Sequence, residues 1–448
     1  NAGAEVILAE TLNRLGGSSS LSGGVTYCGG GTALQKALGF EDSVEAMYGY
    51  IAESGRKHPH LDKVQLYCED SVAHFDWLVA QGVPFNEQYI DEKGLGFNEA
   101  GLYYSGGEEA YPWRDKFKPA PRGHVPWEKG HQGGRKMMRV LVAKAQQAGV
   151  KTLLRTGGER LILESDGRVT GAVVNANGQR KTVRARRGVV LACGGFIHNR
   201  EMVKLYAPEL YDCSTPWGNA GDLGLGILMG MGAGGAAIRM DQGFAIGPIY
   251  PPQNTIKGIV VNQQAQRFGT EDDYHAVMGN DVTYKHDGQA YFICDAHSDR
   301  PPGADNQPLL ATAKNIRQLE QKLNFAPGSL THTVKYYNKY AAKGQDPLFH
   351  KHEKYLQPLS KPPYKAYDLG VTTSQYSSHT FGGLHTRKTG QVVSVWGEDI
   401  PGLYAAGRTT SGLPTSPYIA SGISVGDCTY FGRQAGIYAA KDGAGSHS

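Results

Sequence analysis

Short apolar runs that end in an acid or in small residues recur along the chain and predict parallel strands buried inside a sheet. The runs are "AEVILAE" (4–10), "GVVLACGGF" (188–196) and "GLYAAGR" (402–408). A different pattern occurs in "GGRKMMRVLVAKAQQAG" (133–149), where apolar residues recur at helical spacing beside a basic face and a glycine closes the stretch. Buried strands and amphipathic helices in one chain predict an α/β fold.

The composition and the hydrophobic pattern of the sequence change twice and divide it into three segments. Residues 160–187 alternate like a β-meander whose turns are "SDGR" and "NANGQ". From 236 to 376 aromatic residues and prolines increase and the pattern becomes less regular. We therefore expect a main domain in two pieces, 1–235 and 377–448, with a second, inserted domain at 236–376.

The overall composition is that of an ordinary globular protein, and it excludes several classes of function. The net charge of +4 is too small to indicate binding to nucleic acid. No apolar window reaches the length of a membrane helix. Six cysteines are scattered without a CxxC pair, which suits a reduced cytoplasm and predicts no metal site.

Glycine is the unusual residue, with 61 in 448 positions, grouped at the ends of apolar runs. Glycine permits positive φ angles and close backbone contact, so these groups predict a long ligand lying along a sheet edge. Glu10 ends the first strand, where an acid of a dinucleotide-binding fold accepts hydrogen bonds from a ribose. The stretch "GGSSSLSGG" that follows suits a pyrophosphate. A strand carrying GxGxxG is expected about twenty residues before such an acid, and we expect it in a segment before Asn1 that the sequence omits.

These motifs resemble one known family. The chain is similar to the flavoproteins that include 3-ketosteroid dehydrogenases and the flavin subunits of fumarate reductases. The matching stretches are "GGSSSLSGGVTYCGGGT", "HFDWLVAQGVPF", "APRGHVP", "GGRKMMRVLVAKA", "VVLACGGFIHNREMVKLYAP", "GDLGLGILMGMGA", "VNQQAQRFGTED", "FGGLHT", "GQVVSVWGEDIPGLYAAGR" and "ASGISVGDCTYFGRQAG". The resemblance implies a Rossmann-like domain that binds FAD, with an inserted α+β catalytic domain.

The resemblance also implies which residues contact the cofactor. They lie at strand ends, in glycine turns and at the start of the last helix. The set is Glu10, Gly17, Ser18, Ser19, Ser20, Ser22, Gly23, Gly24, Gly194, Gly195, Asp222, Gly407, Arg408, Gly422, Ile423 and Ser424.

Two branches of this family differ in their chemistry. Fumarate reductases need arginines, whose forked guanidinium groups clamp a dicarboxylate. The stretch "SPYIASG" before the last glycine turn, where that branch has an arginine, has none. The pair His379 and Thr380 does match that branch, so it stays open as an alternative.

The ketosteroid branch uses tyrosines to remove a proton next to a ketone while a hydride leaves for flavin N5. A tyrosine base requires a neighbouring donor in a dry pocket to lower its pKa of about 10. By resemblance, Tyr274 and Tyr418 are the catalytic tyrosines, Tyr418 acting as acid and base. The N–H of Gly422 would hold the 3-keto oxygen beside Ser421, and Tyr104 would line the substrate mouth.

The favoured reaction is introduction of the 4,5 double bond into a 5α-saturated 3-ketosteroid. The turn reads "YIASG", whereas enzymes that desaturate carbons 1 and 2 tend to show "YPG". The alternatives are a 3-ketosteroid Δ1-dehydrogenase, a fumarate reductase-like ene-reductase, and a non-catalytic binding protein. The expected partners are a steroid and an electron acceptor, without nucleic acid. Contact with a membrane surface and the oligomeric state stay open.

Overall fold

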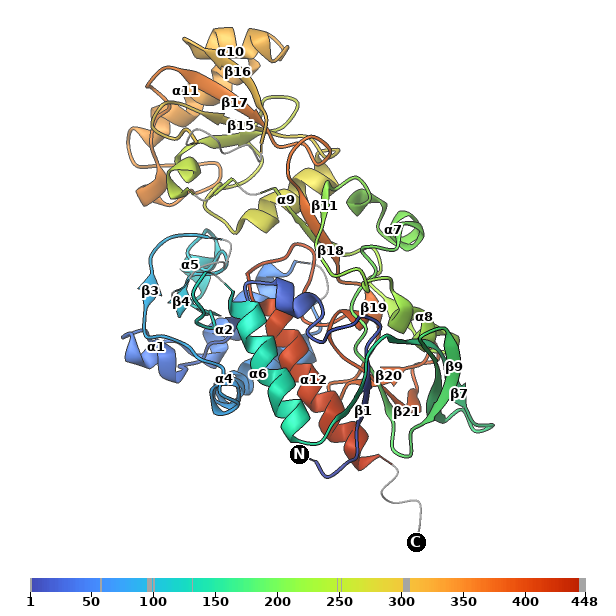
Figure 1. The fold of residues 1–448 in the computed structure, drawn as a ribbon. Helices are drawn as coiled ribbons and strands as arrows, with labels where there is room; N and C mark the ends of the chain where they lie inside the picture. Colours follow the sequence, from blue (N-terminus) through green and yellow to red (C-terminus); the bar gives the residue numbers. More distant parts are fainter. Residues whose placement is uncertain are drawn as a thin grey trace.

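The computed structural model shows a mixed α/β protein built as two bodies joined by a narrow middle (Figure 1). The larger body holds both chain ends, and the smaller one carries the yellow and orange segments. The α/β fold expected from the sequence is confirmed. The residues described are 2–56, 59–94, 99, 101–130, 132–247, 249–250, 252–300 and 307–442.

The predicted parallel strands are present in the larger body. β10 (Val189–Leu191) pairs in parallel with β21 (Asp399–Ala405), and β20 (Gln391–Val393) adds on the other side of β21 in the antiparallel direction. β1 (Ile7–Ala9) pairs in parallel with β6 (Lys151–Leu153). Because parallel strands end at the same edge, the turns that follow β10 and β21 lie together.

The expected burial of the first strand is wrong. All three residues of β1 are exposed, although they are apolar. Among the strands described, β1 pairs only with β6, so it lies in a two-stranded sheet that leaves its side chains partly uncovered. The apolar run correctly predicts that these residues form a strand, but it does not predict that the strand is exposed.

Two long helices pack side by side through the larger body (Figure 1). They are α6 (Gly133–Gln147), predicted by its periodicity, and α12 (Ile423–Lys441). Met137 of α6 and Val425 of α12 share one apolar cluster. Among the described residues, no helix combines the length and the apolar character needed to span a membrane.

The remaining elements of the larger body surround these helices and sheets. Its helices are η1 (Ser18–Leu21), α1 (Ala33–Ala37), α2 (Val44–Ser54), α3 (Leu61–Glu69), α4 (Ser71–Ala80), α5 (Trp113–Lys116), α7 (Arg200–Tyr206), η2 (Pro208–Leu210), α8 (Leu225–Gly232) and η5 (Gly407–Thr409). β2 (Thr26–Tyr27), β5 (Gly123–His124), β4 (Leu102–Tyr103) and β3 (Tyr89–Ile90) form one sheet in that order. β7 (Thr156–Leu163), β8 (Val169–Ala176) and β9 (Gln179–Arg184) form an antiparallel sheet. β12 (Ala237–Ile238) pairs with β19 (Gly383–Leu384).

The smaller body is a four-stranded antiparallel sheet covered by two helices. The order is β14 (Ile259–Val261), β15 (Tyr291–Cys294), β17 (Tyr364–Asp368) and β16 (Leu309–Ala313). α10 (Ile316–Lys322) and α11 (Ser329–Ala341) pack on it through a shared apolar core. The short helices η3 (Gln253–Lys257) and η4 (Glu353–Tyr355) complete this part.

A small sheet and one helix connect the two bodies. β18 (Ser377–Thr380) lies between β13 (Gly243–Ile246) and β11 (Thr215–Pro216). α9 (His275–Lys285) packs on β13 so closely that a Cβ atom at Gly279 would lie 2.5 Å from the Ala245 carbonyl oxygen. This contact fixes the start of α9, which carries one of the predicted catalytic tyrosines.

Candidate active site

The turns after β10 and β21 meet where the sequence places a cofactor. Leu191 lies opposite Ala405 in the parallel pair, so Gly194 and Arg408 both follow at the same sheet edge. The Thr409 hydroxyl connects these turns, because it donates to the Gly194 carbonyl at 3.2 Å. Two segments more than two hundred residues apart in the chain thus form one surface.

The carboxylate of Asp222 joins two other predicted cofactor residues. Arg408 Nη2 lies 2.5 Å from Asp222 Oδ2, and Ser18 Oγ donates to the same oxygen at 2.8 Å. The Ser18 hydroxyl also accepts from the backbone N–H of Asn219 at 3.0 Å. Asp222 is almost fully buried, so these charge-assisted hydrogen bonds are the strong kind. The residue types predicted from three separate motifs therefore form one network.

Glycine is required at several points around this network because the backbone has no room for a side chain. A Cβ atom at Gly194, where φ is +80°, would lie 2.0 Å from Asp222 Oδ1. One at Gly195 would lie 2.6 Å from Thr380 Oγ1. One at Gly24 would lie 2.4 Å from the backbone nitrogen of Gly134. The glycines therefore hold backbone segments close together, as a cradle for a dinucleotide does.

The serine-rich stretch forms the short helix η1 rather than an open loop. The Ser20 hydroxyl donates to the Gly17 carbonyl at 2.8 Å, and the Ser22 hydroxyl donates to the Ser19 carbonyl at 2.8 Å. Ser and Thr hydroxyls commonly bond the local backbone in this way. Gly23 packs against the first turn of α6, where a Cβ at Gly133 would lie 2.5 Å from the Gly23 oxygen. These side chains therefore shape the turn by bonding to its own backbone.

Glu10 follows β1, as expected from the sequence. Its backbone N–H donates to the Leu153 carbonyl at 2.9 Å, which continues the pairing with β6. Its Oε1 atom accepts from the Leu12 backbone N–H at 2.8 Å. The carboxylate is therefore held in a fixed orientation at a strand end.

Two buried polar atoms near the glycine cradle have no hydrogen-bond partner within the described part of the chain. They are Arg408 Nη1 and His379 Nε2. Buried polar atoms are almost always bonded in proteins, so such orphans mark the place of a polar ligand. A Cβ atom at Gly195 would lie 3.7 Å from Arg408 Nη1, which puts this orphan beside the cradle. The donors and the glycines together fit a flavin dinucleotide.

The two predicted tyrosines come together next to this cradle. Their ring centroids are 6.1 Å apart, and both side chains are buried. The Tyr274 hydroxyl lies 2.8 Å from the Ser421 hydroxyl. The Tyr418 hydroxyl accepts from the backbone N–H of Ser424 at 3.1 Å. Ile423 packs in the same apolar cluster.

The local backbone explains why these side chains converge. Tyr274 caps the N-terminus of α9, where its own N–H donates to Asp273 Oδ1 at 2.7 Å. Gly422 caps α12 with a φ of +104°, and a Cβ there would lie 2.7 Å from the Tyr27 nitrogen. The Gly422 carbonyl accepts from that same N–H at 3.2 Å. The start of α12 is therefore pressed against β2, which fixes Tyr418 and Ser421 just before it.

Burial dominates the electrostatics of both tyrosines. Burial raises the pKa of Tyr274 well above its usual value, and Tyr418 raises it further, while the Ser421 hydroxyl opposes the shift. Burial also raises the pKa of Tyr418, opposed by Ser424 and by the Gly422 backbone N–H. Among the described groups that shift these two pKa values most strongly there is no arginine or lysine. Both phenols are therefore protonated near neutral pH.

Aromatic rings line the side of the site formed by the connecting sheet. Phe244 lies 5.2 Å from Tyr418 and 4.6 Å from His379, measured between ring centroids. Phe381 lies 5.4 Å from Tyr418. Burial, with Arg408 second, holds the pKa of His379 well below its usual value, so its imidazole is neutral. This wall suits a flat apolar molecule rather than a dicarboxylate.

The structure brings Tyr103, and not Tyr104, next to the catalytic pair. Burial raises the pKa of Tyr103, with the Ser421 hydroxyl opposing and Tyr418 adding to the shift. Tyr104 is only partly buried, and its ring meets the edge of Tyr89 at 6.5 Å. Consecutive residues of an extended segment face opposite sides. The alternation predicts that only one of the two tyrosines faces this side, and the packing around Ser421 decides that it is Tyr103.

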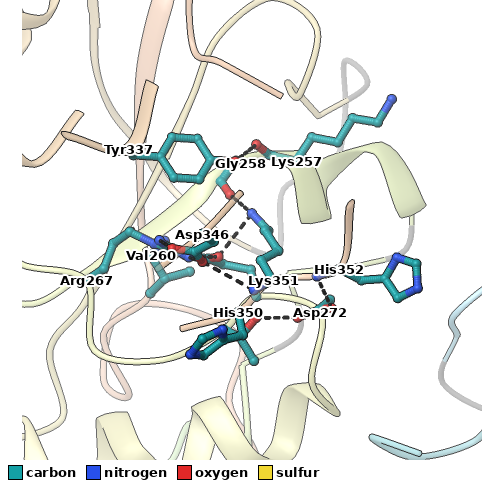
Figure 2. Close-up of polar contacts among 12 residues, drawn as sticks. Lys257, Gly258, Val260, Arg267, Asp272, Tyr337, Asp346, His350, Lys351 and His352 are labelled. Carbon is teal, nitrogen blue, oxygen red and sulfur yellow. Dashed lines mark hydrogen bonds and ion pairs between the residues drawn. The ribbon is translucent and has the colours of Figure 1, made fainter. Parts of the chain in front are cut away.

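A buried network of four charged residues holds the loop that leads to Tyr274 (Figure 2). Arg267 Nη2 lies 2.7 Å from Glu271 and 3.0 Å from Asp346. Lys351 Nζ lies 3.0 Å from Glu271. Each of the four side chains is at most 3% exposed. Two cations and two anions make the network neutral, which is the condition for burying charges.

The same segment makes further bonds to the loop. The Lys351 ammonium donates to the Gly258 carbonyl at 2.7 Å, and the His352 backbone N–H donates to Asp272 Oδ2 at 2.8 Å (Figure 2). Residues 346–352, between α11 and η4, therefore hold both β14 and the catalytic loop. The sequence did not predict the contact between Arg267 and Asp346, because the two residues lie 79 positions apart and nothing in the residues around them indicates that they meet.

The glycine cradle, the orphaned donors and the Asp222 network define an FAD-binding protein. The FAD binding domain family matches residues 1–425, and the chain belongs to it. Within this class the chain is similar to the 3-ketosteroid-Δ4-(5α)-dehydrogenase of Rhodococcus jostii RHA1, solved with 4-androstene-3,17-dione. The two are 38% identical with a TM-score of 0.92, covering 98% of this chain and 92% of that one.

Curated relatives come from both branches of the family. The probable fumarate reductase Ifc3 of Shewanella frigidimarina is 29% identical, over 98% of this chain and 71% of its own length. The 3-oxo-5-alpha-steroid 4-dehydrogenase of Comamonas testosteroni is 28% identical, over 90% of this chain and 88% of its own length. The resemblance stated from the motifs is confirmed, and FAD is the cofactor of the family.

The glycine cradle yields a prediction about cofactor content. Gly194→Ala places a Cβ against Asp222 Oδ1 at a backbone angle that side chains avoid, so the purified variant should carry little flavin. Flavin per chain, measured by absorbance, tests this. Gly436→Ala in α12 is the matched control, because a Cβ there meets nothing within 4 Å. Normal flavin content in Gly194→Ala would contradict the inference that this turn holds the cofactor.

The charged network yields a prediction about stability. Asp346→Asn removes one anion and leaves a surplus positive charge buried, which should cost about 3–5 kcal/mol. Thermal unfolding should show a clearly lower Tm. Asp399→Asn, whose partner Arg387 is 47% exposed, is the control and should cost about 1 kcal/mol or less. Equal shifts for the two variants would show that the network does not stabilise the loop.

A third prediction concerns the pH dependence of stability. Burial raises the pKa of Asp273 from 3.8 to about 7. The folded protein therefore binds this proton more tightly than the unfolded chain, and its contribution to stability is lost as pH rises from about 4 to about 7. Asp273→Asn should flatten the fall in unfolding free energy over that range in chemical denaturation. An unchanged slope would mean that the carboxyl is not desolvated.

Proposed function

We propose that the chain is an FAD-dependent 3-ketosteroid dehydrogenase that introduces the 4,5 double bond into 5α-saturated 3-ketosteroids. The observation that carries the proposal is the pair Tyr274 and Ser421, which is buried beside Tyr418 among aromatic rings. Among the described groups that shift the pKa values of the two tyrosines most strongly, none is an arginine or a lysine. The similarity to the Rhodococcus jostii dehydrogenase supports it.

The start of α12 supplies donors for the ketone oxygen. Tyr418 accepts a hydrogen bond from the Ser424 N–H and keeps its own proton, which it can donate to a substrate. The Gly422 N–H opposes the burial effect on the same phenol and is the second donor. Fixed donors aimed at a developing enolate oxygen stabilise the transition state strongly. The positive end of the helix adds to this effect.

Tyr274 is the proton acceptor, and it acts in its deprotonated form. Its phenol first loses its own proton to solvent by way of the Ser421 hydroxyl, 2.8 Å away, and the tyrosinate then takes the proton from C4 and becomes a phenol again. Tyr103 is a third buried phenol near Ser421, which lowers the Tyr103 pKa, and its hydroxyl has no hydrogen-bond partner among the described residues. Bound FAD supplies the acceptor for the hydride that leaves C5. An electron acceptor then restores the cofactor.

The aromatic pocket also separates this proposal from the fumarate reductase alternative. A dicarboxylate requires cations within the pocket. His379 is neutral, and Arg408 already forms an ion pair with Asp222. The Δ1 alternative uses the same ketone chemistry and differs in the position of the new double bond. Identifying the product therefore distinguishes the two ketosteroid reactions.

The roles of the hydroxyl groups can be tested by following flavin reduction under anaerobic conditions. With 5α-androstane-3,17-dione as substrate, Tyr274→Phe and Tyr418→Phe should each slow the reduction about 10²- to 10⁴-fold. Ser421→Ala should slow it less, because Tyr274 retains its own hydroxyl. Tyr340→Phe in α11, in the smaller body, is the control. A product other than the 4-ene, or normal rates in both tyrosine variants, would contradict the proposal.

A further inference from the structure

A cavity of about 220 Å³ lies beside the loop that carries Tyr274. Asp273, Val277 and Met278, on both sides of the start of α9, form one of its walls. Val277 also belongs to the apolar cluster that holds Tyr274 and Tyr418. The first turn of α9 therefore contributes both to this cavity and to the cluster around Tyr274 and Tyr418.

The lining of the cavity is mostly apolar and comes from both bodies of the protein. Phe268, Leu348 and Phe349 come from the smaller body, and Tyr111 comes from the larger one. Tyr111 and Leu348 are both exposed. An apolar cavity that opens between two bodies is a common place for a small ligand.

Arg56 is the one arginine or lysine among the described residues that line this cavity. Its Nη1 lies 3.3 Å from Asp281 Oδ1, while Lys285 Nζ lies closer to the same oxygen, at 2.7 Å. One carboxylate oxygen is thus shared by two cations, so the group carries a net positive charge. A guanidinium has five N–H donors in a fork that matches a carboxylate, and its side chain here is 41% exposed.

The backbone at this position is a second, independent observation. α2 ends at Ser54, and Arg56 follows with a φ of +48°, in the left-handed region. Glycine occupies such positions without strain, whereas an arginine there is strained. Strain of this kind is typical of residues whose side chain has a task at a ligand site.

The other ionisable group that lines the cavity does not cancel this charge. Burial raises the pKa of Asp273 to about 7, so at neutral pH it carries only part of a negative charge. It lies at the wall nearest Tyr274, whereas Arg56 lies beyond the end of α2.

We propose that this cavity receives the end of the steroid opposite the 3-ketone, and that Arg56 binds a carboxylate on its side chain. The substrate class is then 5α-saturated 3-ketosteroids that carry an acidic side chain. The fused rings are rigid, so a ketone held at Gly422 and Tyr418 directs the side chain to a fixed place. This inference rests on the proposed function and adds a second point of recognition to it.

The test compares 3-oxo-5α-cholan-24-oic acid with its methyl ester on the holoenzyme. The two differ in charge at the side-chain end and share the reacting ketone. The wild type should show a kcat/KM for the acid about fivefold above that for the ester, as expected for a partly exposed ion pair. Added salt should reduce this ratio. Arg56→Gln should bring the ratio to about one, whereas Arg180→Gln on the exposed face of β9 should leave it unchanged.

The outcomes distinguish the inference from the proposed function. A wild-type ratio near one, or an unchanged ratio in Arg56→Gln, would overturn the role of Arg56 while 5α-androstane-3,17-dione is still oxidised. No flavin reduction by any of the three steroids would overturn the proposed function itself. The salt dependence of the wild-type ratio needs no variant, so it decides the matter even if Arg56→Gln does not fold.

Discussion

The buried carboxylate of Asp222 is the interaction on which the larger body depends. It receives Arg408 from the turn after β21 and Ser18 from η1, and it fills the space that a side chain at Gly194 would need. Three segments that are distant along the chain meet at this one group. The same atoms that stabilise the fold belong to the set of residues predicted to hold the cofactor, so a substitution of Asp222 is expected to change both the fold and the site.

The smaller body has its own charged centre, formed by Arg267, Glu271, Asp346 and Lys351. The two centres order different parts of the chain. One orders the turns of the larger body, and the other orders the loop before Tyr274. The catalytic hydroxyls meet where the two bodies touch, so their spacing depends on both centres at once. Such an arrangement gives precise geometry without placing an ion pair among the reacting groups, where it would compete with substrate.

The sequence predicted the parts of the fold that local patterns encode. The parallel strands, the amphipathic helix α6, the glycine turns and the pair Tyr274 and Tyr418 all carry local signals. Features that depend on distant contacts were missed or mistaken. The exposure of β1 depends on which strands lie beside it, and Asp346 meets Arg267 only through the packing of the smaller body. Alternation along the chain separates Tyr103 from Tyr104, but the nearness of Tyr103 to Ser421 and the position of Arg56 both depend on contacts between distant segments.

The bond from the Ser424 backbone to the Tyr418 hydroxyl has a consequence for sequence variation. Its donor is a main-chain N–H, so the orientation of the phenol does not depend on which side chain occupies position 424. Every residue except proline can supply that donor. Any substitution at position 424 other than proline therefore keeps this bond and the orientation of the phenol. The same substitution removes the Ser424 hydroxyl, which lowers the pKa of Tyr418, so position 424 controls the acidity of the tyrosine rather than its placement.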